Sequence, residues 1–198
     1  MTMDIKINAD PESNARCKFT VDRPVCPDSS FYFGSPERAQ GSPFAERVFQ
    51  IPGVTGVLIS HERVTVTKSG REDWPVTAKQ VGAAIRAHLA TGQPAVSDAV
   101  RAAIPLAAEI RAKVAQVLEK EINPSVAAHG GHVSLIDVKG NTVYLKLGGG
   151  CQGCGSADVT LKQGIETAIR FAAPEVGDIL DSTDHAAGRN PYYTPSAK

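Results

Sequence analysis

The stretch that organises this chain is residues 148–156, which read GGGCQGCGS. Two cysteines, Cys151 and Cys154, stand there at C-x-x-C spacing, with a glycine run before them and a helical pattern after them. Thiolates at this spacing hold zinc, hold an iron–sulfur cluster, cycle as a disulfide or form a structural bridge. The surrounding sequence has to decide among these four uses.

The cysteine stretch joins a predicted strand to a predicted helix. Residues 143–147 alternate apolar and polar side chains, as a half-buried strand does, and the helical pattern begins near Ser156. The glycines permit positive φ and let amide groups approach whatever the thiols hold. A helix N-terminus adds unpaired N–H groups and partial positive charge, which favour thiolate over thiol. The same donors suit a four-thiolate cubane cluster, which is a dianion.

Two thiolates are half of a closed zinc or iron–sulfur site, which generally takes four protein ligands. The other two can come from a second copy of the chain across a two-fold axis, or from this chain. Within the chain, Cys17 and Cys26 stand nine residues apart in what we predict to be another domain. We interpret them as ordinary cysteines near a strand.

Histidines offer a second set of ligands. His129 and His132 form an H-x-x-H pattern upstream of Cys151 and Cys154, which permits a Cys2His2 zinc site, although the order and spacing differ from those of a usual finger. We expect His129 instead to tie the glycine turn by a ring hydrogen bond. His185 is a lone histidine of the tail, and we expect it to be solvated.

A thiol–disulfide function would place the C-x-x-C motif after the first strand of a βαβ unit. Here the preceding elements are predicted to be an antiparallel hairpin over residues 133–138 and 143–147, turning at Lys139-Gly140-Asn141. This context disfavours redox chemistry. A thiol–disulfide or zinc-binding protein that uses the same two cysteines stays as the alternative.

The rest of the second half is predicted to be mainly helical. Apolar residues at helical spacing predict one helix: Ile110, Val114, Val117, Leu118 and Ile122. Asn123-Pro124 is expected to end it, because the residue before proline is pushed out of the helical region. A second apolar stripe over residues 161–172 predicts the helix after the cysteines, and a short strand follows at 176–180. The opposite face of this helix is expected to be solvated and carries Asp158, Lys162, Glu166 and Arg170.

The first half shows fewer periodic segments. Residues 4–33 look irregular and extended, with one strand candidate at 18–21. Ser42-Pro43 is a helix-start signal, and Pro52-Gly53 is expected to end that helix. Two β-rich runs, 54–60 and 64–68, predict a hairpin. A further helix is expected from Thr77 to Gly92, with His88 on its apolar stripe.

These elements predict an α+β fold of two small domains, each with a small antiparallel or mixed sheet and two helices. We expect the first domain over residues 1–92 and the second over 106–198. The linker is assigned to residues 93–105, because the stretch 91–105 contains Gly92, Pro94, Ser97 and Pro105 with little periodicity, apart from one helical turn near 98–103.

The composition is that of a soluble globular protein, with 42% hydrophobic and 21% charged residues. Its 21 basic and 21 acidic residues balance, and no basic run occurs, which argues against nucleic acid or an anionic membrane as the main partner. The start lacks the pattern of a secretory signal, and no apolar run reaches the ~18 residues of a membrane span. We therefore expect a cytoplasmic protein with reduced thiols.

The second half resembles the C-terminal domain of NifU, the Nfu-type iron–sulfur scaffold and carrier domain, over about residues 107–182. The motifs that carry the resemblance are INP (122–124), AAHGG (127–131), VYL (143–145), GCQGC (150–154) and VTLKQGIE (159–166). The tail DHAAGRNPYY (184–193) is similar to that of the bacterial carrier subgroup. Most relatives have an acidic or amide residue where this chain has His132, so that histidine departs from the family pattern.

The first half resembles the Nfu N-terminal domain over about residues 5–92. Its motifs are KF (18–19), SPFA (42–45), FQIPGV (49–54) and VTVT (64–67). In the family this domain is usually assigned to contact with clients or partners, and it is not known to provide cluster ligands.

The resemblance implies that Cys151 and Cys154 from two chains bridge one [4Fe-4S] cluster in a homodimer; a [2Fe-2S] cluster would use the same four thiolates. It implies a carrier that receives the cluster from an assembly scaffold and hands it to apo iron–sulfur enzymes. We expect the chain itself not to be an enzyme, because the sequence offers no catalytic base, nucleophile pair or phosphate-binding loop.

Overall fold

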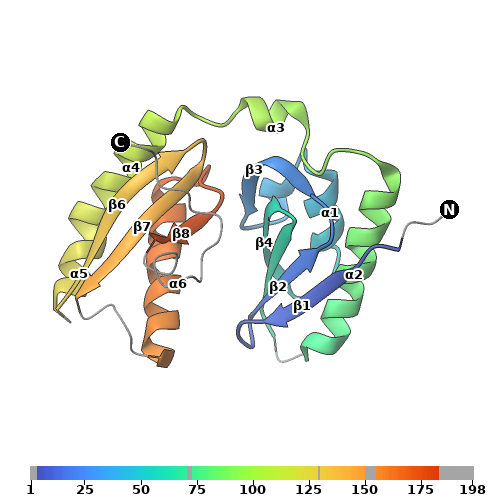
Figure 1. The fold of residues 1–198 in the computed structure, drawn as a ribbon, viewed down its shortest axis with the longest axis horizontal. Helices are drawn as coiled ribbons and strands as arrows, with labels where there is room; N and C mark the ends of the chain where they lie inside the picture. The colour runs from blue at the N-terminus through green and yellow to red at the C-terminus, as the bar shows by residue number, and fades with distance from the viewer. Residues whose placement is uncertain (1–3, 71–72, 129, 150–154, 183–198) are drawn as a thin grey trace. The chain divides into compact units, whose positions relative to one another are not determined.

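Two sheets, each with helices packed on one face, make up the computed structural model of the chain (Figure 1). It describes residues 4–70, 73–128, 130–149 and 155–182. The chain divides into two compact units, Met1–Ile104 and Pro105–Lys198. Each unit combines helices with a sheet, so the predicted α+β class is confirmed.

The first unit contains an antiparallel five-stranded sheet in the order β1-β2-β5-β4-β3. Alternate residues of the inner strands point into the core; Phe19, for example, lies opposite Val64, and both are fully buried. The β4–β5 pair is the hairpin that the β-rich runs predict. The strands are β1 (Ile7–Pro11), β2 (Arg16–Val21), β3 (Cys26–Phe33), β4 (Val54–His61) and β5 (Arg63–Lys68).

The expectation of irregular structure over residues 4–33 is wrong, because this segment forms three strands. Only β2 was expected, and its exposure alternates along its whole length. β1 is an edge strand whose last four residues are all exposed, so it carries no apolar periodicity. β3 has a bulge between Cys26 and Ser30, which interrupts its alternation. Both strands form because they pair with a neighbour in the sheet, β1 with β2 and β3 with β4.

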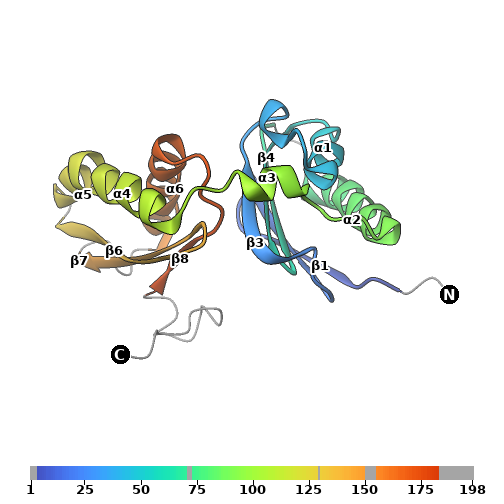
Figure 2. The same ribbon diagram turned by 90° about the horizontal axis from the view of Figure 1, so that it is seen from above.

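Two helices of the first unit, α1 (Pro43–Phe49) and α2 (Trp74–Thr91), lie on the same face of its sheet (Figure 2). The Ser42 hydroxyl accepts a hydrogen bond from the Ala45 N–H at 3.2 Å, so the predicted helix start is confirmed. Gly92 ends α2 in the left-handed conformation, as predicted, although α2 starts three residues before the expected Thr77. A short 3-10 turn, η1 (Glu37–Ala39), precedes α1.

Residues 93–104 pack against the first unit, which differs from the linker that we expected over 93–105. Ala95 and Val96 are buried, and the Ser42 hydroxyl donates to the Ala95 carbonyl at 2.8 Å. Helix α3 (Asp98–Ala102) follows. Gly41 has φ of 85°, and a Cβ there would lie 2.7 Å from a methyl group of Val100. Only glycine therefore fits at this contact.

The second unit has a three-stranded mixed sheet in the order β6-β7-β8. β6 and β7 form the predicted antiparallel hairpin, and β8 pairs with β7 in parallel. The helices lie on one face of this sheet (Figure 2). The elements are α4 (Ala107–Val117), η2 (Leu118–Ile122), α5 (Asn123–Ala127), β6 (Gly131–Lys139), β7 (Thr142–Gly149), α6 (Gly155–Ala172) and β8 (Ile179–Asp181).

The predicted helix end at Asn123-Pro124 is wrong, because helical structure continues through α5 to Ala127. The turn η2 is a π-helix, and the Asn123 N–H bonds to the Leu118 carbonyl, five residues back. A proline ring in an α-helix clashes with the carbonyl four residues before it, here that of Lys120. The wider π-turn accommodates Pro124 without ending the helix.

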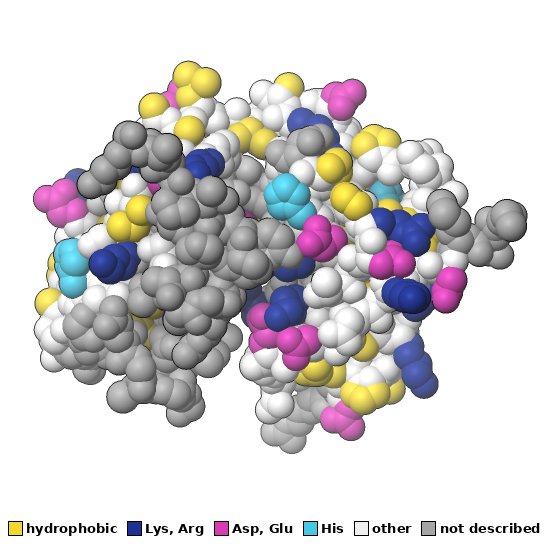
Figure 3. Space-filling view, viewed as in Figure 1, with side chains coloured by type: hydrophobic (Ala, Val, Ile, Leu, Met, Phe, Trp, Pro, Cys, Tyr) yellow, Lys and Arg dark blue, Asp and Glu magenta, His cyan; other side chains and the backbone are white. Residues whose placement is uncertain are grey.

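Charges are mixed on the first unit, where acidic and basic side chains lie next to one another on the face seen in Figure 3. Lys18 pairs with Asp10 at 3.1 Å, and Arg16 pairs with Glu12 at 3.0 Å. Within the described residues, every helix is too short or too polar to traverse a lipid bilayer.

Candidate functional site

Cys151 and Cys154, the predicted ligands, lie outside the described residues, as do His129 and His185. What the structure describes is the frame on either side of the two cysteines. Strand β7 ends at Gly149, and helix α6 begins at Gly155. The two thiols therefore belong to a segment of five residues that runs from the end of a strand to the start of a helix, as the sequence predicts.

The strand side of this frame is the open end of the β6–β7 ladder. His132 lies opposite Gly148, and Gly131 lies opposite Gly149. The preceding Gly130 has a φ of 68°, in the left-handed region. The turn between α5 and β6 thus lies next to the point where β7 leads into the cysteines. His132, which is exposed, is the described histidine nearest in register to that point.

The helix side of the frame is the N-terminus of α6, an 18-residue helix. The first four N–H groups of a helix have no partner within it and carry partial positive charge, which stabilises an adjacent thiolate. The far end of α6 is held firmly. Arg170 donates to the carbonyls of Val176 and Gly177 at 2.8 and 2.7 Å, and Ile169 is fully buried.

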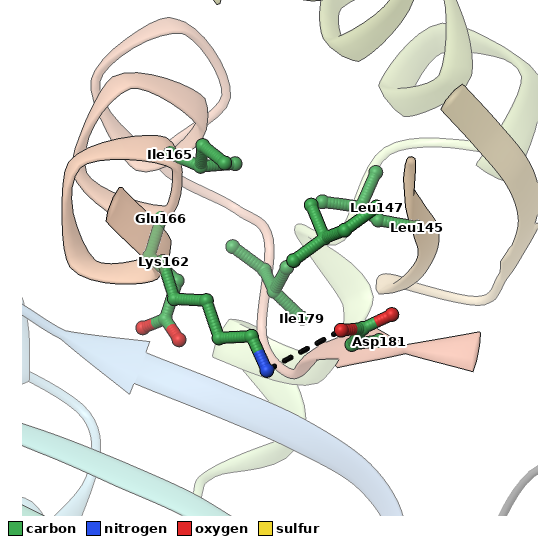
Figure 4. A pocket seen from close by; sticks show the side chains of 7 residues that line it. All are labelled: Leu145, Leu147, Lys162, Ile165, Glu166, Ile179 and Asp181. Carbon is green, nitrogen blue, oxygen red and sulfur yellow. Dashed lines mark ion pairs between the residues drawn. The ribbon is translucent and has the colours of Figure 1, made fainter. Parts of the chain in front are cut away.

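The charged face of α6 is more than a solvated surface, so that expectation is wrong for its described residues. Lys162 pairs with Asp181 of β8 at 3.3 Å, and Arg170 binds backbone carbonyls. Lys162 and Asp181 flank a shallow hollow with Glu166 (Figure 4). Its apolar lining comes from β7, α6 and β8: Leu145, Leu147, Ile165 and Ile179. About 40 Å³ leaves room for only a few water molecules.

The other two cysteines lie inside the first unit. Cys17 on β2 and Cys26 on β3 are fully buried, and two strands separate them in the sheet. Three strand spacings amount to about 14 Å, too far for a disulfide or a shared metal. Burial raises the pKa of the Cys17 thiol to about 11. Arg101 donates to the Cys26 sulfur at 3.5 Å.

Asn123 is a residue whose contacts the sequence analysis missed. Its side-chain amide donates to the Val133 carbonyl at 3.0 Å and accepts from the Val133 N–H at 2.8 Å. The Asn-Pro pair was interpreted only as a helix end, and it is the π-turn that turns this side chain toward β6. Within the described residues, no cluster of three or more His, Cys, Asp or Glu side chains is arranged to hold a metal ion.

Two family models match the chain. The model described as NifU-like domain matches residues 114–180, a range that contains the cysteine stretch. The model described as Scaffold protein Nfu/NifU N terminal matches residues 5–92. Together they account for most of both units, in the order that the sequence predicts.

Curated relatives match over part of their length. The Fe/S biogenesis protein NfuA of Acinetobacter baylyi is 45% identical over 91 residues, which are 43% of this chain and 43% of that protein. NfuA of Pseudomonas savastanoi pv. phaseolicola is 49% identical over 88 residues, 42% of this chain and 45% of that protein. The matched part is under half the length of these relatives.

Solved structures also match with low identity. A NifU-like protein from Saccharomyces cerevisiae has a TM-score of 0.43 and 19% identity, covering 48% of this chain and 85% of that protein. A crystal structure of a Staphylococcus aureus protein has a TM-score of 0.34 and 20% identity, covering 41% of this chain and 98% of that protein.

Proposed function

Because this chain belongs to the Nfu/NifU family, whose two domain types it combines, we propose that it carries an iron–sulfur cluster as cargo and delivers it to apo-proteins. The observation that carries the proposal is the position of Cys151 and Cys154 within the NifU-like match, between the end of β7 and the start of α6. The NfuA relatives, named for Fe/S biogenesis, support the same role.

The number of cysteine ligands that a cluster needs indicates that two chains share it. One chain offers two thiolates at this position, and a cluster takes four. The described residues hold no second set, since Cys17 and Cys26 are buried in separate strands of the other unit. We therefore assign the remaining ligands to Cys151 and Cys154 of a second copy, with a [4Fe-4S] cluster shared across a two-fold axis. A [2Fe-2S] cluster would use the same four thiolates.

A shared site of this kind suits transfer. Each chain contributes two ligands from a glycine-rich segment, so separation of the chains or exchange of one ligand pair opens the site. An electron-transfer protein would be better served by four ligands enclosed in one chain. The first unit then serves as a contact surface for the assembly scaffold that supplies the cluster or for the apo-enzymes that receive it. Catalysis by the chain itself forms no part of the proposal.

Anaerobic reconstitution with iron and sulfide tests the proposal. Wild-type protein is expected to take up roughly four iron and four sulfide ions per pair of chains, and to dimerise as it does so. Cys151→Ala and Cys154→Ala are expected to lose uptake almost entirely. The matched controls Cys17→Ala and Cys26→Ala remove buried thiols of the first unit and are expected to keep it.

The alternative is a thiol–disulfide or zinc-binding protein that uses the same two cysteines. Tight zinc binding without sulfide uptake, or efficient disulfide reduction, would refute the carrier proposal in its favour. Loss of loading in the Cys17 or Cys26 variant, with the fold intact, would show that the ligands do not come from two copies of one segment.

A further inference from the structure

We propose that Asn123 is a positioning residue for the cysteine stretch: its side chain holds the end of the β6–β7 ladder from which that stretch begins. The inference rests on the proposed function, because it concerns the cluster that Cys151 and Cys154 would hold. Asn123 itself is not a ligand, and it lies in the helical segment before β6.

The contact between Asn123 and Val133 has the same hydrogen bonds that a neighbouring strand would make. Asn123 uses both halves of its amide, donating to the Val133 carbonyl at 3.0 Å and accepting from the Val133 N–H at 2.8 Å. Val133 belongs to β6, which is an edge of the three-stranded sheet. Backbone groups on the open side of an edge strand need a partner from outside the sheet. Asn123 supplies it at one residue.

The ladder carries this restraint to the cysteines. Backbone groups alternate in direction along an antiparallel strand, so Val133 faces Asn123 while its neighbour His132 faces β7. His132 lies opposite Gly148, the residue before the last of β7. A shift of β6 at Val133 therefore also moves His132, which pairs with the end of β7 that leads to Cys151.

The π-turn is the second observation that points to this role. A residue inserted into a helical turn rotates every following side chain by about 100° relative to a continuous α-helix. The turn closes on the N–H of Asn123 itself, which bonds to the Leu118 carbonyl. Such turns are rare and occur often at functional sites. Here the turn directs one amide side chain at the backbone of β6.

The opposite end of the same hairpin supplies a matched control. Asn141, in the turn between β6 and β7, donates its side-chain amide to the Glu175 carbonyl at 3.1 Å. Asn141 is buried, and its side chain, like that of Asn123, bonds to the backbone of another segment. It lies at the end of the β6–β7 ladder farthest from Gly149. Loss of either amide should destabilise the unit, but only loss of Asn123 should disturb the cysteine stretch.

The test compares full-length wild type with Asn123→Ala, Asn123→Asp and Asn141→Ala. Each protein is loaded anaerobically with iron and sulfide, and the rate of cluster loss to excess chelator is measured beside the thermal unfolding temperature. Asn123→Ala should lose the cluster about tenfold faster, with a changed visible circular dichroism spectrum. Asn141→Ala should lower the unfolding temperature but keep the rate within about twofold. Asn123→Asp keeps the acceptor for the Val133 N–H and should lie between wild type and Asn123→Ala.

Equal rates for Asn123→Ala and wild type, or equal acceleration by Asn141→Ala, would overturn the inference. If Asn123→Ala does not fold, Asn123→Asp decides, and a wild-type rate in that variant also overturns it. Amide hydrogen exchange on cluster-free protein gives an independent readout: exchange at Gly148 should rise more than exchange at Val143. A wild type that takes up no cluster refutes the proposed function itself, whereas normal wild-type loading with unchanged variants refutes only the role of Asn123.

Discussion

The two units hold the same residue type in opposite settings. In the first unit, Cys17 and Cys26 point into the core of a five-stranded sheet and are fully buried. In the second, Cys151 and Cys154 belong to the segment between the end of β7 at Gly149 and the start of α6 at Gly155. The comparison teaches that the place of a cysteine in the fold governs which chemistry is open to it. A thiol inside a sheet is held as an apolar group, whereas one between a strand and a helix N-terminus can become a thiolate.

The largest effect that we expect from this comparison is on stability. Phe19→Ala removes a fully buried ring from the first unit and should cost that unit about 3–5 kcal/mol in its free energy of unfolding. The second unit has its own sheet and should keep its stability and its capacity to load iron and sulfide. Denaturant unfolding, monitored by hydrogen exchange mass spectrometry, measures the stability of each unit separately.

The matched control for that change is Phe171→Ala in α6. Phe171 is 90% exposed, so its truncation should alter stability by no more than about 0.5 kcal/mol. An equal loss of protection in both units of the Phe19→Ala variant would contradict the division, because it would mean that they unfold together.

The second effect is on thiol reactivity. The pKa of Cys17 is about 11 because burial disfavours its thiolate, so near pH 8 that thiolate is about a hundredfold scarcer than in an ordinary exposed cysteine. Cys151 and Cys154 should therefore be alkylated first in the native, cluster-free protein, with Cys17 slower by at least about a hundredfold. Time-resolved alkylation with peptide mass spectrometry measures this order. Fast modification of Cys17 would show that the core of the first unit opens readily.

The smallest effect concerns pH. His88 is 2% exposed, its Nε2 has no hydrogen-bond partner among the described residues, and burial lowers its pKa, with the Arg47 charge adding to the shift. The neutral form is thus favoured in the folded state. The contribution of neutral His88 to stability is complete above the pKa of an unfolded histidine, about 6.5. It is lost as the pH falls through the lower pKa of His88 in the folded state.

The first unit should accordingly become less stable as the pH falls below about 6.5. In His88→Leu the slope of the free energy of unfolding against pH should fall by up to one proton, as measured by urea unfolding at a series of pH values. His61→Asn is the control, since His61 is exposed and asparagine accepts its positive φ of 51°. A wild-type slope in His88→Leu would exclude His88 as the cause.

Features with a local cause could be predicted from the sequence. Ser42 before Pro43, the glycine after Thr91 and the turn at Gly140 each depend on a few neighbouring residues, and each stands where it was expected. The buried stripe of the α4 segment followed from apolar periodicity in the same way. The position of the C-x-x-C motif between a strand and a helix was equally readable.

Features that depend on distant partners were missed. Strand β1 forms because it pairs with β2, and its own exposed residues carry no apolar pattern. Residues 93–104 contain few periodic signals, yet the small Gly41 allows them to pack on the first unit. The bonds of Asn123 to Val133 required a π-turn, which the Asn-Pro signal alone did not reveal.

Strand β1 has a practical consequence for handling this protein. An open sheet edge is a template on which other chains can add strands. Strand β1 ends with Asp10 and Pro11, and Glu12 follows it; the proline and the two carboxylates, which pair with Lys18 and Arg16, protect this edge. High salt screens the charges of those carboxylates. Strongly saline buffers should therefore promote aggregation through this edge. Such self-association needs no cluster, and dilution into low-salt buffer should suppress it.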